Sequence, residues 1–262
     1  MTIVREQGAR FNDAEVAQNY LYRAPYAAAL YEFLGDRVTN HHRALDLGCG
    51  PAKIAGELAT WFDQVDAVDP SLTMLQQGQK FHGDAANIRW IHASAEDAVL
   101  KGPYDLVTIG TAAHWMDPAV VFPKIAGVLR SDGVLATIQG DHPHQAPWEE
   151  AWLVFLRRWL ERVGRQYDET AFANAIAAHE PWMDIAGRET FVFDYRQTLA
   201  DFVACQHSRA TWTVTQLGKE LAAEFDRELT ELLTPFAHEG QLEFCLQTNL
   251  VWGTPRSTLV ES

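Results

Sequence analysis

Short apolar runs alternate with segments of helical periodicity from residue 43 to residue 140. This alternation is typical of βαβ units, in which helices join the strands of a parallel sheet. The apolar runs predict strands at residues 43–47, 65–68, 88–91, 104–109 and 133–138. The periodic segments predict helices at residues 51–61, 71–81 and 118–129. We therefore expect an open, doubly wound α/β sheet in this part of the chain.

Turn and capping residues stand at the boundaries that this periodicity gives. Ser71 is a residue type that caps helix N-termini, and Pro51 and Pro118 suit the first turn of a helix. Residues 131–133, Ser-Asp-Gly, are predicted to turn the chain into the fifth strand. The local signals and the periodicity therefore agree.

The chain after residue 140 differs, because aromatic residues recur there along amphipathic helices. Such helices are predicted at residues 148–163, 169–178 and 216–236. Strands are predicted at residues 189–198 and 242–252, and we interpret them as the last two strands of the same sheet. The helices that interrupt them would form a lid. The opening segment, residues 11–34, is predicted to be helical and to pack near the mouth of the sheet.

The composition is that of a globular protein and argues against several kinds of partner. Among 262 residues, 21 Lys+Arg stand against 35 Asp+Glu, which gives a formal charge of −14 with His neutral. Phosphate contacts need clustered cationic charge, so we expect no nucleic-acid partner and a preference for a cationic small ligand. The three cysteines lack the spacing of a disulfide framework or a zinc site, which favours a cytoplasmic location. No run of about 18 apolar residues occurs, so no membrane partner is expected.

The strongest local signal is a glycine turn between a predicted strand and a predicted helix, residues 44–52, ALDLGCGPA. Glycines let the backbone approach a ligand closely, and a helix N-terminus offers free N–H groups. A dinucleotide site would place Gly or Ala three residues after Gly50, where this sequence has Lys53. The negative charge of Asp46 is unfavourable beside a diphosphate, whereas it suits a ligand that bears an amino group and a sulfonium.

Three further polar segments accompany the next strands. Asp69 ends the second strand in VDAVDPS, residues 65–71, where a carboxylate can accept both hydroxyls of a ribose. The segment HASAED, residues 92–97, follows the third strand, where a side chain can meet an adenine edge. The segment YDLVTIGTAAHWMD, residues 104–117, contains the fourth strand and its end. The glycine turn and these segments all lie at carboxyl ends of consecutive parallel strands, where open α/β sheets bind ligands.

Together the four segments resemble the class I S-adenosylmethionine-dependent methyltransferases, especially the small-molecule, methyltransferase type 11-like branch with a His-Trp-Phe-Asp-like segment after strand four. The resemblance covers residues 15–140 in detail and the remainder by general layout. It implies an α/β, Rossmann-like, doubly wound, mostly parallel seven-stranded sheet with a helical lid inserted after strand five. It also implies S-adenosyl-L-methionine as cofactor and S-adenosyl-L-homocysteine as product. We divide the chain into an N-terminal helical cap segment (1–40), a cofactor-binding core (41–140), and a lid and acceptor region with the last two strands (141–262).

The resemblance assigns parts of the cofactor to particular positions. The acid-Leu-Gly-x-Gly turn, whose acid is Asp46, holds the methionine part, and the acid after strand two, Asp69, holds the ribose. The Ala-Glu segment after strand three lies by the adenine. Upstream, residues 20–26, YLYRAPY, look like the family's Tyr-x-x-x-Arg-Pro-x-Tyr-Pro entry segment, in which Arg23 or a nearby tyrosine meets the cofactor carboxylate. The cofactor-binding candidates are Tyr20, Arg23, Asp46, Gly48, Gly50, Asp69, Pro70, Ala95, Glu96, Gly110 and Thr111.

Two positions depart from the family pattern. Ala52 stands where the first motif often has a third glycine, and Ala24 stands where a proline would follow Arg23. Both changes lie in segments that would meet the cofactor.

His114 and Trp115 follow the fourth strand and are the candidates nearest to the chemistry. His114 would be the base that receives the acceptor's proton, or alternatively a polar residue hydrogen-bonded in the cofactor pocket. Trp115 would form a wall of the substrate pocket or contact the lid.

Two later segments carry further histidines. Residues 141–144, Asp-His-Pro-His, lack a third and fourth ligand at recognisable spacing, so we expect no metal and assign His142 and His144 to a loop that faces the acceptor. In residues 205–212, CQHSRATW, the candidates His207 and Trp212 either line the acceptor site or belong to a helix end. No spacing separates these two interpretations.

A tryptophan-rich stripe at helical spacing, residues 148–159, is typical of a core face. Trp148, at the end of the stripe nearest to the predicted site, is a candidate for contact with substrate.

The sequence thus predicts methyl transfer to a small polar metabolite, with an amine nitrogen preferred as acceptor because the chain is acidic and has additional histidines. Two alternatives remain: O-methylation of a carboxylate or hydroxyl, and a catalytically silent protein that binds the cofactor or a nucleoside. The oligomeric state is left open.

Overall fold

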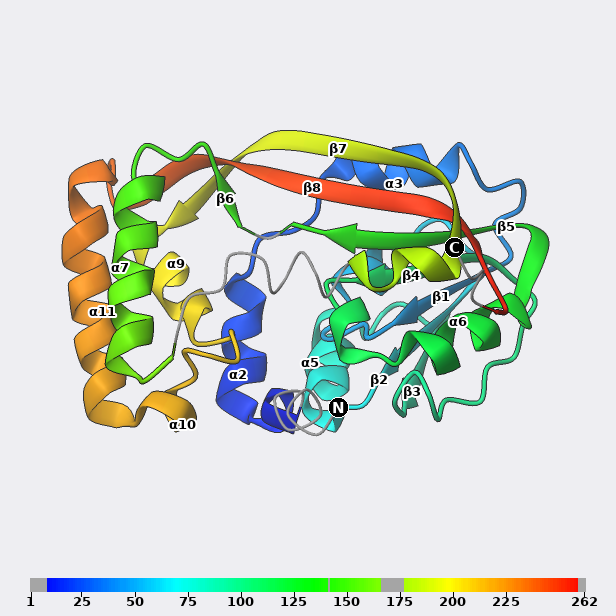
Figure 1. The fold of residues 1–262 in the computed structure, drawn as a ribbon, viewed down its shortest axis with the longest axis horizontal. Coiled ribbons are helices and arrows are strands. Elements are labelled where there is room, and N and C mark those ends of the chain that lie inside the picture. Colours follow the sequence, from blue (N-terminus) through cyan, green and yellow to red (C-terminus); the bar gives the residue numbers. More distant parts are fainter. Residues whose placement is uncertain (1–8, 141, 166–176, 259–262) are drawn as a thin grey trace. The chain divides into compact units, whose positions relative to one another are not determined.

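The computed structural model describes residues 9–140, 142–165 and 177–258, and the chain divides into two compact units. Figure 1 gives the labels of the helices and strands. We call the two units the core unit (Tyr26–Gly140, Thr170–Phe191 and Thr248–Ser262) and the helical unit (Met1–Pro25, Asp141–Glu169 and Val192–Gln247).

Five strands pair in parallel in the core unit, in the spatial order β3-β2-β1-β4-β5. β8 (Gln241–Pro255) continues this order and pairs with β5 in antiparallel orientation through residues 249–253. The parallel strands are β1 (Arg43–Leu47), β2 (Gln64–Asp69), β3 (Ile88–His92), β4 (Tyr104–Gly110) and β5 (Leu129–Gln139). All five were predicted, and the doubly wound α/β class is confirmed.

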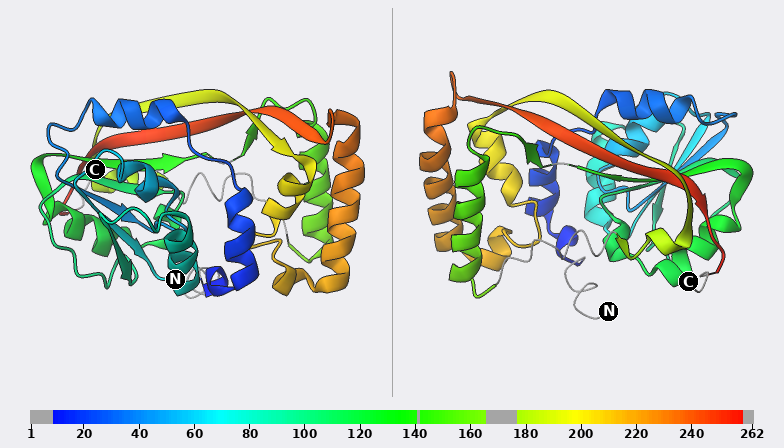
Figure 2. Two further views of the ribbon diagram at one scale, coloured as in Figure 1. Left: turned by 180° about the vertical axis from the view of Figure 1, so that it is seen from behind. Right: turned by 45° about the horizontal axis from the view of Figure 1, so that its top comes forward.

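Helices cover both faces of this sheet, because successive strand residues point to opposite sides. Along β1, Ala44 joins one buried apolar cluster and Leu45 joins the other. The first cluster includes residues of α3 (Ala28–Gly35), α4 (Lys53–Leu58) and α5 (Leu72–Phe81). The second includes residues of η3 (Ala113–Trp115) and α6 (Pro118–Ala126). Figure 2 shows the same elements from two further sides.

The helix boundaries confirm some predicted caps and correct one. The Ser71 hydroxyl accepts a hydrogen bond from the Met74 N–H at the start of α5, and Pro118 begins α6 behind the cap Asp117. Pro51, by contrast, lies outside α4, so its predicted place in the first helical turn is wrong. The cap of α4 is Ala52, whose left-handed backbone (φ 63°) separates Pro51 from the helix.

The predicted turn at residues 131–133 is also wrong, because this segment lies inside β5. Leu129 pairs with Tyr104, and Val134 pairs with Leu106 only two residues further along β4. β5 thus accommodates three additional residues as a register irregularity, and its exposed Ser131 and Asp132 resemble turn residues in the sequence.

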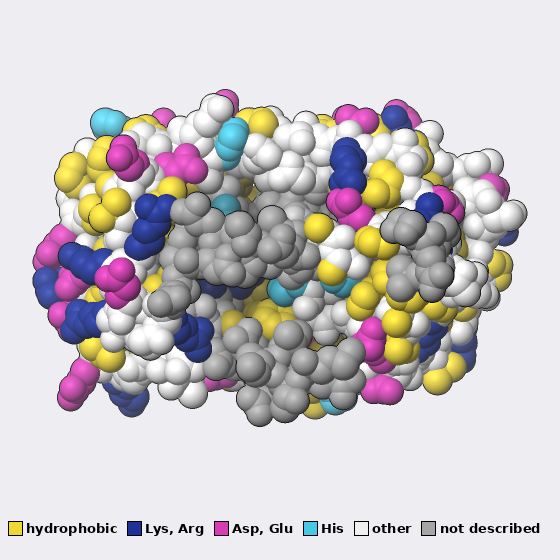
Figure 3. Space-filling view, viewed as in Figure 1, with side chains coloured by type: hydrophobic (Ala, Val, Ile, Leu, Met, Phe, Trp, Pro, Cys, Tyr) yellow, Lys and Arg dark blue, Asp and Glu magenta, His cyan; other side chains and the backbone are white. Residues whose placement is uncertain are grey.

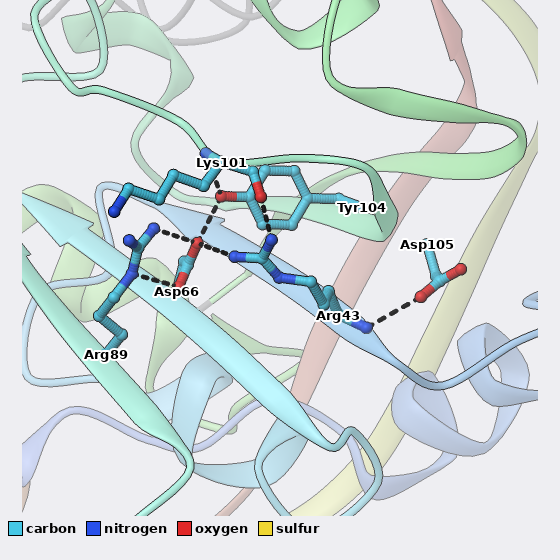
Figure 4. A network of polar contacts seen from close by, with 6 residues as sticks. All are labelled: Arg43, Asp66, Arg89, Lys101, Tyr104 and Asp105. Atoms are coloured by element: carbon cyan, nitrogen blue, oxygen red, sulfur yellow. Dashed lines mark hydrogen bonds and ion pairs between the residues drawn. The ribbon is translucent and has the colours of Figure 1, made fainter.

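Aspartate 66 binds basic side chains from two neighbouring strands near the amino ends of the sheet (Figure 4). Its fully buried carboxylate accepts two hydrogen bonds from Arg89, at 2.7 and 2.6 Å, and one from Arg43 at 3.1 Å. The Tyr104 hydroxyl also donates to it. Burial, together with the hydrogen bond and charge of Asp66, raises the pKa of Tyr104 to about 12.

The helical unit packs its aromatic residues into a cluster of its own, which includes Trp148, Trp152 and Phe225. Its helices are η1 (Ala9–Asn12), α2 (Ala14–Asn19), η2 (Tyr20–Tyr22), α7 (Glu149–Arg162), α9 (Leu199–Gln206), α10 (Val214–Leu217), α11 (Lys219–Leu233) and η5 (Thr234–Phe236). Gly218, with φ 79°, separates α10 from α11, where one helix was predicted. The helix predicted at residues 169–178 lies almost entirely outside the described residues.

The sheet contains eight strands among the described residues, where seven were predicted. The additional strand is the two-residue β6 (Pro143–His144), which pairs with β8 through Leu246 and Cys245. The two predicted late strands are present as β7 (Met183–Thr198) and β8, which pair with each other. β7 begins at Met183, after the short helix η4 (Glu180–Trp182), and earlier than predicted.

No described helix combines the length and apolar character needed to cross a membrane.

Candidate active site

The glycine turn after β1 has a backbone that ordinary residues rarely adopt. Gly48 and Gly50 have φ values of 68° and 54°. A Cβ atom at Gly48 would lie 2.5 Å from the Cβ of Ala112, so any residue larger than glycine would clash at this position. The Gly48 and Cys49 N–H groups donate to the Val68 carbonyl at 2.8 and 3.0 Å, which fixes the turn to the end of β2.

Asp46 lies beneath this turn and is 1% exposed. Its carboxylate accepts a hydrogen bond from the Thr108 hydroxyl at 2.8 Å and one from the Ala55 N–H at 3.2 Å. Burial raises the pKa of Asp46 to about 7, although these hydrogen bonds oppose the increase. Asp46 thereby ties the first turn of α4 to β1 and β4, and its assignment to the cofactor's methionine part stays a prediction.

Asp69 ends β2 and binds the backbone on both sides of it. One carboxylate oxygen accepts from the Gly50 N–H and the other from the Ser71 N–H, each at 2.8 Å. Burial raises the pKa of Asp69 to about 6, against these hydrogen bonds and the charge of His92. A carboxylate has about four lone-pair positions, so two remain for donors such as ribose hydroxyls.

The segment after β3 is fastened to the start of α6. The Lys124 ammonium donates to the carbonyls of Ala95 and Glu96, at 3.1 and 2.7 Å. The Glu96 carboxylate accepts from the Asp117 N–H at 2.9 Å. Pro70, also predicted to contact the cofactor, is exposed, and its carbonyl lies 3.0 Å from the His92 Nε2. The core unit therefore joins the loops after β2, β3 and β4 by direct hydrogen bonds.

The end of β4 brings Gly110, Thr111, His114 and Trp115 into the same region of the core unit as the glycine turn, since Ala112 lies over Gly48. The His114 and Trp115 rings are half-buried, with centroids 4.5 Å apart. His114 is thus at the carboxyl end of the sheet, as predicted, and its role as a base stays a prediction.

The candidates Tyr20 and Arg23 belong to the helical unit. The Arg23 guanidinium donates to the hydroxyl and the carbonyl of Ser208, at 2.7 and 2.8 Å, and lies 4.2 Å from the Tyr20 ring centre. These contacts order Tyr20 and Arg23 within the helical unit. Contact of Arg23 with a cofactor carboxylate stays a prediction.

The acceptor candidates after β5 have different environments. His142 is exposed, and His144 is half-buried in β6. Trp148 is 1% exposed and packs edge-on against Trp152, Phe202 and Phe244, as expected for a core residue. Its contact with substrate stays a prediction. Among residues 9–140, 142–165 and 177–258, no group of three or more His, Cys, Asp or Glu side chains could hold a metal ion.

His207 and Trp212 lie in the interior of the helical unit. The His207 Nδ1 is 2.6 Å from the Trp212 carbonyl, and its Nε2 is 2.7 Å from the Asp226 carboxylate. Burial alone would lower the pKa of His207, but these hydrogen bonds and the Asp226 charge together raise it. Trp212 stacks on Phe225 at 5.1 Å. Both side chains fasten the end of α9 to α11, and their contact with an acceptor stays a prediction.

Sequence reasoning missed two residues of the core unit. Thr108 interrupts the apolar residues Leu106, Val107 and Ile109 of β4, and that break in the pattern was a usable signal for its bond to Asp46. Tyr26 was noted only as part of the entry segment, yet its hydroxyl lies 3.0 Å from the Thr111 Oγ1. Nothing in the sequence links residues 85 positions apart.

Known proteins are similar to part of this chain. Residues 45–137 match the family model described as the methyltransferase domain. The match covers about a third of the chain, and for this segment it confirms the resemblance to a methyltransferase domain and the S-adenosyl-L-methionine cofactor that the sequence predicted.

Relatives of known sequence also match part of the chain. A probable S-adenosylmethionine-dependent methyltransferase of Saccharomyces cerevisiae is 30% identical over 118 residues, which cover 43% of this chain and 40% of the relative. An uncharacterised methyltransferase of Mycobacterium tuberculosis is 28% identical over 165 residues, which cover 62% of this chain and 63% of the relative. The matched segments thus span less than two thirds of these relatives.

Solved structures extend the likeness of fold to most of the chain. A candidate type II methyltransferase from Anaeromyxobacter dehalogenans has a TM-score of 0.69 at 19% identity, covering 91% of this chain and 99% of that one. A candidate methyltransferase from Bacillus halodurans has a TM-score of 0.50 at 18% identity, covering 88% and 100%. At these identities the likeness supports the Rossmann-like fold.

Proposed function

We propose that the chain transfers a methyl group from S-adenosyl-L-methionine to a small-molecule acceptor, and that the acceptor atom is an amine nitrogen. The observation that carries the proposal is the pair of buried carboxylates, Asp46 and Asp69, beside a glycine turn at adjacent strand ends. Neither carboxylate forms an ion pair with Lys or Arg in the described part of the chain. A cationic ligand would supply the missing positive charge.

The residues present fit the parts of this cofactor. Asp69 would accept the ribose hydroxyls at its two remaining lone-pair positions. Ala95 and Glu96 would border the adenine, and the backbone of the glycine turn would lie under the methionine part. When bound, the cofactor supplies an electrophilic methyl group on its sulfonium. The enzyme's task is then to align the acceptor with that group and to exclude water, and orientation can contribute roughly 7–11 kcal/mol in favourable cases.

His114 would take the proton that an ammonium acceptor must lose before its nitrogen can attack. An imidazole titrates close to neutral pH, which suits this transfer. The same region is acidic through Asp46, Asp69 and Glu96, so it would attract a cationic amine rather than an anionic acid. On the face shown in Figure 3, acidic and basic side chains are interspersed over the surface.

The cofactor part of the proposal is tested by calorimetry with S-adenosyl-L-homocysteine. We expect Asp69→Asn to weaken its binding about ten- to a hundredfold, since hydrogen bonds to a charged group contribute about 1.5–3 kcal/mol. Glu57→Gln is the matched control, because it removes an exposed carboxylate from the neighbouring helix α4. Circular dichroism must show both variants folded, since Asp69 also binds two backbone N–H groups. Unchanged affinity in Asp69→Asn would contradict the ribose assignment.

The acceptor part is tested with labelled S-adenosyl-L-methionine and a panel of small amines, carboxylates and alcohols. Transfer to amines alone supports the proposal. Transfer to a carboxylate or hydroxyl would replace it with O-methylation. Binding of S-adenosyl-L-homocysteine without transfer to any member of the panel would favour a catalytically silent binding protein.

A further inference from the structure

The backbone has a strained conformation at the end of β4, next to the candidate base. Thr111 has φ 48°, in the left-handed region that β-branched residues rarely occupy. Such a conformation costs about 1–3 kcal/mol and persists only where the surroundings hold it. The Thr111 N–H donates to the Ile138 carbonyl at 2.8 Å, which secures one side of the residue.

The Tyr26 hydroxyl secures the other side. It lies 3.0 Å from the Thr111 Oγ1, and a Cβ atom at Gly110 would come within 3.2 Å of it. The chain that carries Tyr26 is itself held, because the N–H of the next residue, Ala27, donates to the buried Thr248 hydroxyl at 3.2 Å. A fixed segment thus presents a hydroxyl to the strained residue.

The conformation of Thr111 sets the direction in which the chain leaves β4. The next residues form the tight turn η3, in which the Trp115 and Met116 N–H groups bond to the Ala112 and Ala113 carbonyls, each at 2.9 Å. His114 lies in the middle of this turn. Because the turn is rigid, a rotation at Thr111 would move the imidazole as a whole.

We propose that Tyr26 is a positioning residue for methyl transfer: its hydroxyl holds Thr111 in the left-handed conformation and so places His114. This inference rests on the proposed function. It differs from a cofactor-carboxylate role for a tyrosine of the entry segment, since the hydroxyl acts on the β4 turn. Tyr26 therefore acts mainly on the transfer step through His114, and a smaller effect on cofactor affinity would pass through Thr111, itself a cofactor-binding candidate.

The test compares Tyr26→Phe with the wild type in kcat and KM for the best acceptor of the panel, and in the Kd of S-adenosyl-L-homocysteine. We expect kcat to fall about ten- to a hundredfold, the cost of a small misplacement, while Kd changes less than about twofold. Tyr31→Phe is the control, because it removes a phenol hydroxyl from helix α3 that forms no hydrogen bond among the described residues. An unchanged kcat, or a Kd that weakens in step with kcat, would overturn the inference.

The Thr111→Gly background shows whether Tyr26 acts on His114 through the conformation of Thr111 or only stabilises the surrounding structure. Glycine adopts positive φ without help, so Tyr26→Phe should have little effect on kcat in that background. An equal loss in both backgrounds would contradict the proposal.

A readout that does not depend on turnover is the NMR signal of the His114 ring, assigned through its absence in His114→Asn. We expect this signal to shift in Tyr26→Phe and to remain in place in Tyr31→Phe. An unmoved signal would overturn the inference even if the wild type proved active. If the wild type transfers no methyl group, the proposed function fails, and the signal still decides whether Tyr26 places His114.

Discussion

Buried aspartates at the two ends of the core unit's sheet have different kinds of partner. At the amino ends, Asp66 binds Arg43, Arg89 and the Tyr104 hydroxyl, so its charge is matched within the protein. At the carboxyl ends, the partners of Asp46 and Asp69 among the described residues are backbone N–H groups and one hydroxyl. Because Asp46 and Asp69 form no ion pair with Lys or Arg in the described part of the chain, we propose the carboxyl end of the sheet as the end that binds a cationic ligand.

The largest effect that follows concerns Asp66. We expect Asp66→Asn to lower the free energy of unfolding by about 3 kcal/mol, because two arginines lose a buried partner. The value is at the lower end of the range for buried pairs, since the arginine side chains are 23% and 30% exposed. Urea denaturation measures it. Asp84→Asn, at an exposed loop position, serves as the control and should change the stability by less than about 0.5 kcal/mol.

Asp66→Asn also tests whether ligand binding is confined to the carboxyl ends of the strands. Where Asp66→Asn is folded, its affinity for S-adenosyl-L-homocysteine should equal that of the wild type. A large loss of affinity with little loss of stability would reverse the comparison and place ligand binding at the amino ends.

A second effect is a pH dependence of stability from the carboxyl-end pair. The pKa values of Asp46 and Asp69 are raised from 3.8 to about 7 and about 6 by burial. Between these limits the native state binds more protons than the unfolded state, so the slope of unfolding free energy with pH is negative. This contribution is fully present below about pH 4 and is lost as the pH rises to about 7.

Asp46→Asn isolates that effect. An amide of the same size keeps one acceptor for the Ala55 N–H and carries no charge to bury, so we expect stability at pH 8 to increase. The decline of stability between pH 4 and pH 7 should become shallower than in the wild type. Denaturation curves across this range measure it, and an unchanged slope would show that Asp46 ionises without cost.

The sequence predicted the carboxyl-end site because its signals are local. Gly48, Gly50 and Asp69 stand beside strand boundaries that periodicity already locates, and the parallel sheet then brings those boundaries together. The helix cap Ser71 was predictable for the same reason.

The contacts that fix the site were not predictable, because they join distant residues. Asp46 binds Thr108 from 62 positions away, and Tyr26 binds Thr111 from 85. The ion pairs of Asp66 in the motif VDAVDPS were also not predictable, since only the register places Arg43 and Arg89 beside it. In β5, polar Ser131 and Asp132 suggested a turn because a sequence does not show that a strand bulges there.

A third and smaller effect is proton release on cofactor binding. A cation near Asp46 would lower its pKa, so at pH 6.5 binding should release a fraction of a proton. Calorimetry in two buffers of different ionisation enthalpy measures that fraction. S-adenosyl-L-methionine should release more than S-adenosyl-L-homocysteine, which lacks the sulfonium charge, and equal release would mean that the sulfonium lies far from both carboxylates.

The smallest effect concerns Ala52, which caps α4 with φ 63° at a position where glycine is expected in the family. The left-handed conformation costs alanine about 1–2 kcal/mol, and glycine loses about 0.5–1 kcal/mol more backbone entropy on folding. Ala52→Gly should therefore stabilise the protein by at most about 1.5 kcal/mol, with unchanged affinity for S-adenosyl-L-homocysteine. Ala55→Gly, inside α4, is the opposite control and should destabilise it by a similar amount. If both variants are destabilised equally, the carboxyl-end turn carries no strain at Ala52, and its shape is set by the hydrogen bonds to Asp46, Asp69 and the Val68 carbonyl.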